Sequence, residues 1–269
     1  MTLKDAYAYS VRFLEYNGVD EADFKALCVC CHIAKIKNSD YPLHKDDFVF
    51  EGTLAKLLWR LKEGEPLQYV LGKWEFYDSE FYVGEGVLIP RPETEELVEL
   101  AIKHIGDKKL TVFDLCAGSG CIGLSIAKAC PNTEVTLFEK SEKAFEYLLK
   151  NAEGVKNAKP LLYDINEAYE GRADIIISNP PYVRSDDIKE LQSEVLREPE
   201  MALDGGEDGL DFYRIINDKW YKNLNENGLL FLEIGEEQGE DIIGILSNYK
   251  KIEVLKDIYG NDRMVKGMV

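Results

Sequence analysis

The sequence lacks any long hydrophobic run, and this excludes a membrane-spanning helix. Its longer apolar stretches, DIIIS and GLLFLEI, have only the length of β-strands. The first twenty residues carry charges throughout and lack the apolar core of a signal peptide, which indicates a cytoplasmic protein. The 269 residues also lack long low-complexity tracts, and with 45% hydrophobic and 30% charged residues the chain is predicted to be globular, not fibrous or disordered.

Basic side chains are scarce. There are 32 lysines and arginines against 50 aspartates and glutamates, which gives a net charge of −18. Such a charge repels the phosphate backbone, whose neutralisation usually drives nucleic-acid binding. We therefore expect no stable binding of DNA or RNA, although a local basic patch would be compatible with this balance.

Cysteines are too few and too unevenly spaced for a disulfide framework, so we expect thiols at positions 28, 30, 31, 116, 121 and 130. The segment from Cys28 to His32 contains the C-x-x-C-H pattern of covalent haem attachment. However, Phe24, Leu27, Cys28 and Cys31 recur at helical spacing, which favours small apolar residues on a buried helix face. We expect neither haem nor a metal site.

The pattern of elements predicts two domains and a linker. Residues 1–73 alternate amphipathic helical segments with polar turns and indicate a small helical domain. Residues 74–87 are rich in aromatics and β-formers and predict a hairpin, with a turn at Asp78-Ser79. Residues 88–269 alternate β-rich and helical runs, which predicts an α/β domain with a mostly parallel sheet covered on both faces. Its last two strands, joined near Gly260, predict an antiparallel hairpin at the sheet edge.

A glycine-rich loop follows the first strand of this α/β region. The run FDLCAGSGCIG contains G-x-G-x-x-G at Gly118, Gly120 and Gly123 and opens a helix. Glycines let the backbone approach a ligand, and the helix N-terminus presents free N–H groups to an anion. Glu139, about twenty residues on, stands where an acid meets ribose hydroxyls. A dinucleotide and S-adenosylmethionine are the two competing ligands.

Two further acids bear on that choice. Asp114, at the mouth of the loop, would repel a pyrophosphate but could accept hydrogen bonds from an ammonium group, which favours S-adenosylmethionine. Asp164 and Ile165 lie where a third strand is predicted to end. There the acid could accept from an adenine amino group while the apolar neighbour covers the ring; a plain loop explains this pair nearly as well.

The most specific motif is Asn179-Pro180-Pro181-Tyr182, directly after the predicted fourth strand. The prolines hold the segment stiffly at the carboxyl end of the sheet, where open α/β folds bind ligands. The Asn179 amide oxygen and the Pro180 carbonyl can each accept one hydrogen of a substrate –NH2 group, and Tyr182 can pack against its plane.

This acceptor pair suits methylation of a poorly nucleophilic nitrogen. An amide or aromatic amine lone pair is delocalised. Gripping both hydrogens can polarise the nitrogen and aim its lone pair at a sulfonium methyl group. No strong base is needed at first, because the nitrogen becomes acidic only as it is methylated.

Together these residues resemble the glutamine-N5 methyltransferases of peptide chain release factors, the HemK or PrmC family. The resemblance covers nearly the whole chain. It includes GEPLQYVLGKWEFYDSEFYV (64–83), VLIPRPETEELVE (87–99), EPEMALDGGEDGLDFYR (198–214), LEIGEEQ (232–238) and KDIYGNDRMVKG (256–267). The four residues 179–182 alone would not separate this family from adenine-N6 methyltransferases, whereas LIPRPETE and EPEMALDGGEDGL are far more specific.

The resemblance implies a seven-stranded, Rossmann-like methyltransferase domain, with the helical domain helping to recognise class 1 release factors and the chain acting as a monomer. It implies that residues 179–182 hold the glutamine amide, that Glu139 binds ribose, and that Asp164 and Ile165 flank adenine. The methionine and ribose part of the cofactor would be lined by Cys116, Ala117, Gly118, Ser119 and Gly120.

Two positions depart from the family pattern. Cys116 stands where the family usually has glycine, which suggests a negative φ there, and Glu139 replaces a frequent aspartate. Other residues have less defined roles. Arg91, Glu93 and Glu95 could border the cofactor's methionine end or simply begin a helix. Glu198, Pro199, Gly205 and Gly206 could form a wall or lid.

Three functions therefore compete. The leading hypothesis is methyl transfer from S-adenosylmethionine to the glutamine of a Gly-Gly-Gln loop in a release factor. The second is methylation of an adenine amino group in nucleic acid, with the base flipped into the pocket. The third is a binding protein that holds a dinucleotide or regulates translation without catalysis. Net charge argues against the second.

Overall fold

The computed structural model describes all 269 residues, and the chain divides into two compact units. One unit comprises residues 1–73 together with 192–197, and the other comprises residues 74–191 and 198–269. No helix in either unit combines the length and the apolar character needed to cross a membrane.

The first unit is helical, as predicted. Its elements are α1 (Leu3–Tyr16), α2 (Ala22–Ala34), the 3₁₀ helix η1 (Asn38–Leu43), α3 (Glu51–Lys62), α4 (Leu67–Leu71) and the short 3₁₀ helix η3 (Val195–Arg197). Thr2 caps α1 because its hydroxyl accepts a hydrogen bond from the Asp5 N–H at 3.2 Å. Leucines buried at helical spacing, such as Leu54, Leu58 and Leu61 on α3, supply its core.

Helix α2 buries its three cysteines, as expected for a helix face packed into a core. Burial raises the pKa values of Cys30 and Cys31 to about 11, so these thiols stay protonated at neutral pH. The prediction was wrong for Phe24, whose side chain is 47% exposed. Lys25 takes a buried position instead, because its ammonium group pairs with the Glu194 carboxylate from the second segment of this unit.

A hairpin of β1 (Lys73–Phe76) and β2 (Ser79–Tyr82) opens the second unit, with its first residue, Lys73, counted in the first unit. Its turn lies at Tyr77-Asp78, one residue before the predicted place, and Tyr77 adopts a positive φ of 53°. Phe76 and Phe81 pack edge to face with ring centroids 6.1 Å apart and are fully buried. The hairpin therefore belongs to the core of the unit that it opens.

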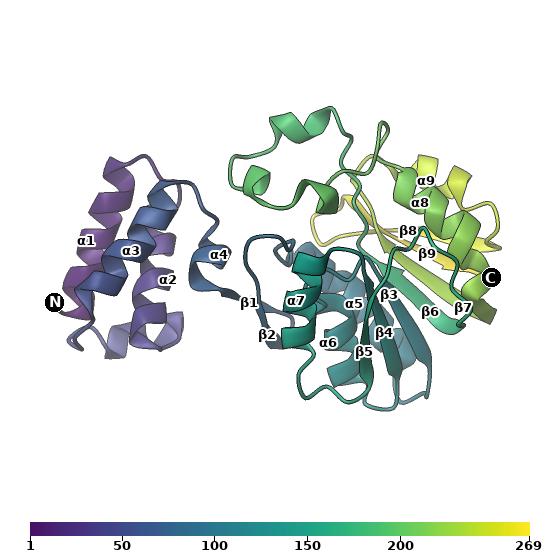
Figure 1. Ribbon diagram of the computed structural model, residues 1–269, viewed down its shortest axis with the longest axis horizontal. Coiled ribbons are helices and arrows are strands. Elements are labelled where there is room, and N and C mark those ends of the chain that lie inside the picture. Colours follow the sequence, from purple (N-terminus) through teal and green to yellow (C-terminus); the bar gives the residue numbers. More distant parts are fainter. The chain divides into compact units, whose positions relative to one another are not determined.

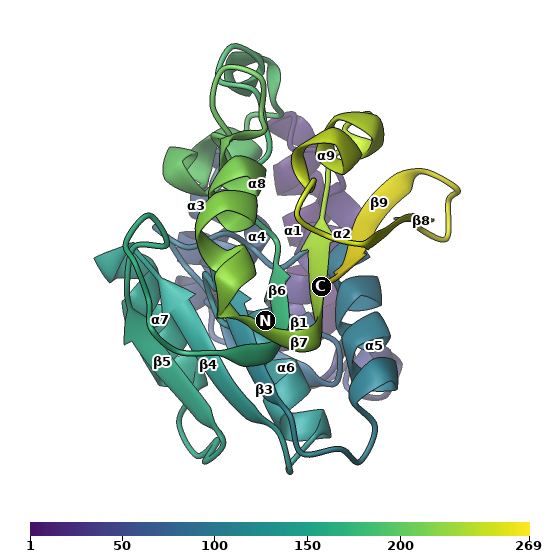
Figure 2. The ribbon, with the colours of Figure 1, turned by 90° about the vertical axis from the view of Figure 1, so that its right-hand side faces the viewer.

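Seven strands form the main sheet, in the order β5-β4-β3-β6-β7-β9-β8 (Figure 2). The first five strands in this order are parallel to their neighbours, and β9 is antiparallel to both β7 and β8. This confirms the mostly parallel sheet with an antiparallel hairpin at one edge. The strands are β3 (Thr111–Leu115), β4 (Glu134–Glu139), β5 (Ala158–Leu162), β6 (Ala173–Ser178), β7 (Leu224–Glu233), β8 (Lys251–Lys256) and β9 (Asp262–Met268).

Helices cover both faces of this sheet (Figure 1). One face carries α5 (Glu93–Ile105), α6 (Cys121–Ala129) and α7 (Glu142–Asn151), and the other carries α8 (Asp211–Ile215) and α9 (Gly239–Ile245). Helix α8 continues through the π turn η5 (Ile216–Trp220) and the 3₁₀ turn η6 (Tyr221–Asn223). Two shorter 3₁₀ turns, η2 (Asp187–Glu190) and η4 (Glu200–Ala202), follow β6. Each face has its own apolar core, one built around α5 and α6 and the other around Tyr213 and Trp220.

The sheet order creates a switch point between β3 and β6, because the chain winds outward from β3 in one direction and from β6 in the other. Open α/β sheets bind ligands beyond the carboxyl ends of their strands at such a point. In the register, Leu115 lies beside Ser178, and Ser178 lies beside Leu232. The carboxyl ends of the three strands thereby gather Cys116, Asn179 and Glu233 at one edge.

Candidate active site

A cavity of about 320 Å³ opens at this edge, within the second unit, and we call it the switch-point cavity. It is large enough for a nucleoside-sized ligand, since small-molecule sites start at roughly 300 Å³. Most of the predicted site residues line it: Cys116, Ala117, Gly118, Ser119, Glu139, Asp164, Ile165, Asn179 and Pro181. Four others, Asp114, Gly120, Pro180 and Tyr182, lie beside or beneath it without forming its wall.

The glycine loop turns sharply between β3 and α6. Gly118 and Gly120 have φ values of 56° and 82°, which glycine adopts without strain. Gly120 also packs closely against α7, because a Cβ atom there would lie 2.4 Å from Leu148 Cδ1. The expected negative φ at Cys116 was wrong: φ is 60°. The turn out of β3 imposes the left-handed conformation whichever side chain is present, and the cysteine carries that strain.

Glu139, the last residue of β4, links the glycine loop to that strand. Its carboxylate accepts hydrogen bonds from the Gly118 N–H and the Ser141 N–H, each at 2.7 Å. Burial raises the pKa of Glu139, although these N–H donors oppose the effect. The carboxylate is therefore anchored by backbone groups while it lines the cavity, as an acceptor for ligand hydroxyl groups would have to be.

Asp114 lies beneath the loop and is fully buried. One carboxyl oxygen accepts the Gly123 N–H at 2.9 Å, and the other has no hydrogen-bond partner. Burial raises the pKa of Asp114 to about 8. The residue that sequence reasoning placed at the mouth of the loop thus sits one layer deeper, supporting the start of α6.

Asp164 and Ile165 follow β5 and line the same cavity. Lys140 Nζ lies 2.8 Å from an Asp164 carboxyl oxygen, and the Asn166 N–H and side chain donate to the other oxygen. Burial alone would raise the pKa of Asp164, but these donors outweigh it and lower the pKa. Ile165 is buried beside Trp220, whose indole N–H donates to the Ile165 carbonyl at 2.8 Å. An apolar surface and a charged acceptor therefore stand next to each other.

The segment 179–182 is clamped from several sides. Ser178 closes β6 by donating to the Leu115 carbonyl at 2.6 Å, and both prolines are buried. Gln238 donates to the Tyr182 carbonyl at 3.0 Å, and Gly205 packs against the backbone of Pro181 and Tyr182. Burial raises the pKa of Tyr182 to about 12, so its phenol stays neutral. The motif is therefore held rigidly at the site, and Asn179 and Pro181 form part of the cavity wall.

The sequence left the role of Glu198 undefined, and the structure shows which groups it binds. Its side chain is 2% exposed, and its two oxygens accept the Ile89 N–H at 2.9 Å and the Arg91 guanidinium at 2.5 Å. It thereby joins the segment before α5 to the segment 198–204, and both segments line the cavity. Glu95 acts elsewhere, since it accepts the Tyr77 N–H of the hairpin at 2.9 Å.

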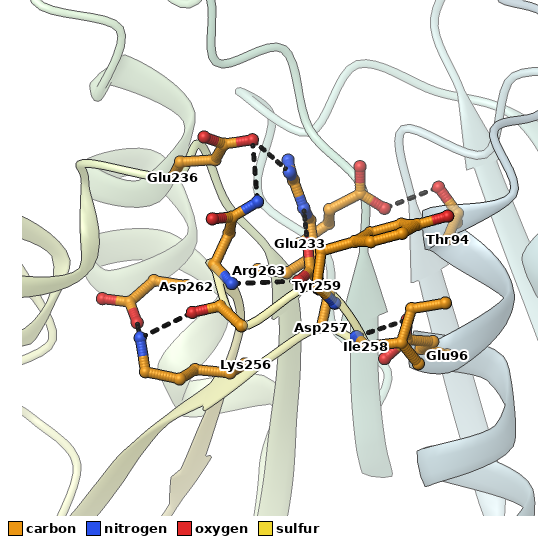
Figure 3. Close-up of polar contacts among 12 residues, drawn as sticks. Thr94, Glu96, Glu233, Glu236, Lys256, Asp257, Ile258, Tyr259, Asp262 and Arg263 are labelled. Carbon is orange, nitrogen blue, oxygen red and sulfur yellow. Dashed lines mark hydrogen bonds and ion pairs between the residues drawn. The ribbon is translucent and has the colours of Figure 1, made fainter.

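Sequence reasoning assigned no role to Thr94 and Glu233. Thr94 lies in the first turn of α5 and lines the cavity, and Glu233 is the last residue of β7. Both are buried, and they are hydrogen-bonded to each other at 2.5 Å (Figure 3). The available signal was a lone acid that ends a buried apolar run, GLLFLE, together with the threonine inside RPETE.

The donor and acceptor set of the cavity fits S-adenosylmethionine. The Ser119 hydroxyl lines the cavity at the glycine loop and is buried without a hydrogen-bond partner, which leaves it available to a polar group of the ligand. Glu139 and Asp164 are acceptors suited to ribose hydroxyls and an adenine amino group, and Ile165 and Phe138 add apolar lining. The residues in place thus match the ligand's hydroxyl and amino groups and its apolar ring.

Solved structures share this fold. The chain aligns with a methyltransferase from Pyrococcus furiosus at a TM-score of 0.50 and 18% identity, over 81% of this chain and 98% of that one. It aligns with a 16S rRNA methyltransferase from T. thermophilus in complex with AdoMet and guanosine at a TM-score of 0.52 and 19% identity, over 73% of this chain and 49% of that one. These similarities concern the fold alone.

Sequence comparisons are more specific. The methyltransferase small domain family matches residues 94–209, and the PrmC N-terminal domain family matches residues 5–72. A release factor glutamine methyltransferase of Thermodesulfovibrio yellowstonii is 40% identical over 88% of this chain and 89% of its own length. One from Bacillus anthracis is 35% identical over 98% of both chains. The chain therefore belongs to the family of release factor glutamine methyltransferases.

Proposed function

We propose that this chain transfers the methyl group of S-adenosylmethionine to the side-chain nitrogen N5 of a glutamine in peptide chain release factors, in their Gly-Gly-Gln loop. The observation that carries this proposal is the match of both units to relatives of that name over nearly their whole length. The segment 179–182 alone would not separate a glutamine from an adenine as the acceptor. The match of residues 5–72 to the PrmC N-terminal domain favours the glutamine.

The roles of the cavity residues follow from their chemistry. Bound S-adenosylmethionine supplies an electrophilic methyl group. Residues 116–120 would hold its methionine and ribose part, Glu139 its ribose hydroxyls, and Asp164 with Ile165 its adenine. Asp114 would support this loop from below.

The acceptor nitrogen is handled by the segment 179–182. The Asn179 Oδ1 atom and the Pro180 carbonyl accept the two hydrogens of the glutamine –NH2, while Pro181 and Tyr182 confine the amide plane. Holding both hydrogens in place withdraws the nitrogen lone pair from resonance and fixes its direction. The neutral Tyr182 phenol does not act as a base, because its pKa of about 12 keeps its proton in place.

We assign recognition of the release factor to the helical domain of residues 1–73, followed by the linker 74–87 and the catalytic domain 88–269. The proposed partners are class 1 release factors, met in the cytoplasm where translation takes place. We expect a monomer without stable nucleic-acid binding, since the net charge of −18 disfavours a phosphate backbone.

The test is methyl transfer from labelled S-adenosylmethionine to a purified release factor and, in parallel, to duplex and single-stranded DNA. The modified residue is located by peptide mass. Label on the glutamine of the Gly-Gly-Gln loop, absent when that glutamine is replaced by alanine, is the expected result. Label on DNA alone would reject the proposal in favour of the adenine alternative.

A further inference from the structure

Asn179 has one side-chain hydrogen bond. Its Nδ2 atom donates to the Thr94 hydroxyl oxygen at 3.2 Å, while its Oδ1 atom accepts none from the protein. The Thr94 hydroxyl in turn donates to the Glu233 carboxylate at 2.5 Å (Figure 3). Thr94 and Glu233 are each 2% exposed. The three side chains form a chain of hydrogen bonds that runs from the cavity wall into the protein interior.

Glu233, at the inner end of this series of hydrogen bonds, sets the direction in which they donate. A carboxylate can only accept, so the single hydroxyl hydrogen of Thr94 points to Glu233. The Thr94 oxygen then has only lone pairs left for Asn179, and these attract the –NH2 end of the amide and repel its oxygen. An asparagine amide has nearly the same shape either way round, so partners of this kind decide its orientation.

We propose that Thr94 and Glu233 are positioning residues that orient the Asn179 amide so that its oxygen is presented to the substrate –NH2 group. The inference rests on the proposed function for its catalytic consequence, since that reaction needs an acceptor at this atom. With the amide reversed, Asn179 would present N–H groups to another N–H donor, and the grip on the acceptor nitrogen would be lost.

The surroundings of Glu233 support the role of its charge. Arg263 on β9 faces it, and that guanidinium is held by the carboxylates of Asp257 at 3.4 Å and Glu236 at 2.8 Å (Figure 3). The other titratable groups that act on it, or on which it acts, come from the start of α5, the start of α6, the loop after β6 and α8. They are Arg91, Glu93, Cys121, Tyr182 and Tyr213. When Glu233 is ionised, Thr94 has a fixed acceptor. When it is protonated, it can donate to Thr94, and the chain loses its single direction.

The test compares Thr94→Val, which removes the hydroxyl but keeps the shape, with Thr94→Ser, which restores it. For Thr94→Val, we expect kcat on the release factor to fall about 10- to 100-fold with S-adenosylmethionine affinity within about twofold of wild type. Thr94→Ser should recover most of that loss. Thr133→Val is the matched control, because Thr133 is also buried and its hydroxyl has no partner; it should keep the wild-type kcat.

A second measurement needs no substrate. The side-chain amide signals of Asn179, assigned by their loss in Asn179→Ala, should shift in Thr94→Val and return toward wild type in Thr94→Ser. Wild-type kcat in Thr94→Val, or unchanged Asn179 signals, would overturn the inference. If wild type labels no release factor, the proposed function fails, yet the amide signals still decide the orientation.

Should Thr94→Val not fold, Glu233→Gln takes its place, since a carboxamide can donate as well as accept and no longer sets one direction. We expect kcat to fall about 5- to 20-fold in that variant, with a shift of the Asn179 amide signals. An unchanged kcat with unchanged signals would then reject the inference.

Discussion

Glu198 and Arg91 form an ion pair with an O–N distance of 2.5 Å that joins two segments 107 residues apart in the sequence. The glutamate is almost fully buried, and its second oxygen holds the Ile89 N–H. Both segments line the switch-point cavity. The geometry of the cavity wall therefore depends on one buried carboxylate.

We expect Glu198→Ala to destabilise the protein by about 2–4 kcal/mol, because it leaves a partly buried guanidinium and a buried N–H without their acceptor. Affinity for S-adenosylmethionine should fall as well, since the wall is no longer joined. Urea unfolding and calorimetric titration measure the two effects. Glu153→Ala, at an exposed position after α7, should change neither; equal behaviour of the two variants would contradict the role given to Glu198.

Asn179→Ala should abolish nearly all methyl transfer while it leaves most of the cofactor affinity. Its amide oxygen is the proposed acceptor for the substrate –NH2, and loss of such an electrostatic contact typically lowers kcat by about 10²–10³-fold. Single-turnover rates at saturating S-adenosylmethionine, with calorimetric affinities in parallel, separate the two effects. Unchanged turnover would remove Asn179 from the mechanism.

The pH dependence of kcat should report Glu233. Burial raises the pKa of this carboxyl to about 7 from an ordinary value of 4.5. The ionised form that orients Thr94 therefore grows as pH rises through 7, and kcat should rise with it. Glu233→Gln should flatten this limb, whereas Glu226→Gln, at an exposed position on the same strand, should keep it. An acid limb that persists in Glu233→Gln would assign it to another group.

The raised pKa of Glu233 also predicts how the free energy of unfolding changes with pH. The folded state binds the Glu233 proton more tightly than the unfolded chain does, so this residue lowers stability as pH rises from about 4.5 to about 7. Between pH 5 and pH 8, Glu233→Gln should therefore lose less unfolding free energy than wild type. Urea unfolding at the two pH values measures the difference.

Much of the fold could be predicted from local patterns. The apolar run ADIIIS, the glycines of the loop and the two prolines after Asn179 each constrain the backbone at their own position, and the structure has β6, the turn and the rigid segment where they were expected. Contacts between elements that are distant in the sequence left no such local pattern. The pairing of Thr94 with Glu233 depends on the order β3-β6-β7 and on the placement of α5, which no window of the sequence encodes.

Two positions differ from expectation for the same reason. Asp114 was expected at the mouth of the loop, but the alternation of β3 turns its side chain under α6, where it accepts the Gly123 N–H. Cys116 was expected at negative φ because it carries a side chain, yet the turn forces φ to 60°. In both cases the packing of neighbouring elements outweighed the preference of the residue itself.

The strain at Cys116 can be measured. Glycine adopts a φ of 60° without penalty, whereas L-residues pay about 1–2 kcal/mol in the left-handed region. Both Cys116→Gly and Cys116→Ala remove the thiol, but only the first relieves the strain. We expect Cys116→Gly to be more stable than Cys116→Ala by about 1 kcal/mol in urea unfolding. Equal stabilities would show that the turn carries no strain at this position.

Gly205 is required by close approach of the backbone, not by its φ. A Cβ atom there would lie 2.8 Å from Tyr182 Cα and 2.9 Å from both the Pro181 and Gly209 carbonyl oxygens. The Pro181 and Tyr182 atoms belong to the backbone of the rigid segment 179–182, so they cannot move aside without displacing the residues proposed to hold the substrate amide. Gly205→Ala should therefore lower both the free energy of unfolding, by about 1–3 kcal/mol, and kcat.

Gly244→Ala is the matched control for that change. Gly244 lies in α9, and a Cβ atom there would meet no atom within 4 Å. Alanine in a helix is favoured over glycine by about 1 kcal/mol, so this variant should be as stable as wild type or slightly more stable, with unchanged kcat. If Gly205→Ala kept its kcat while losing stability, the close packing behind residues 181 and 182 would serve folding alone. If kcat and the free energy of unfolding fell together, the reaction would be shown to depend on the position of the segment 179–182.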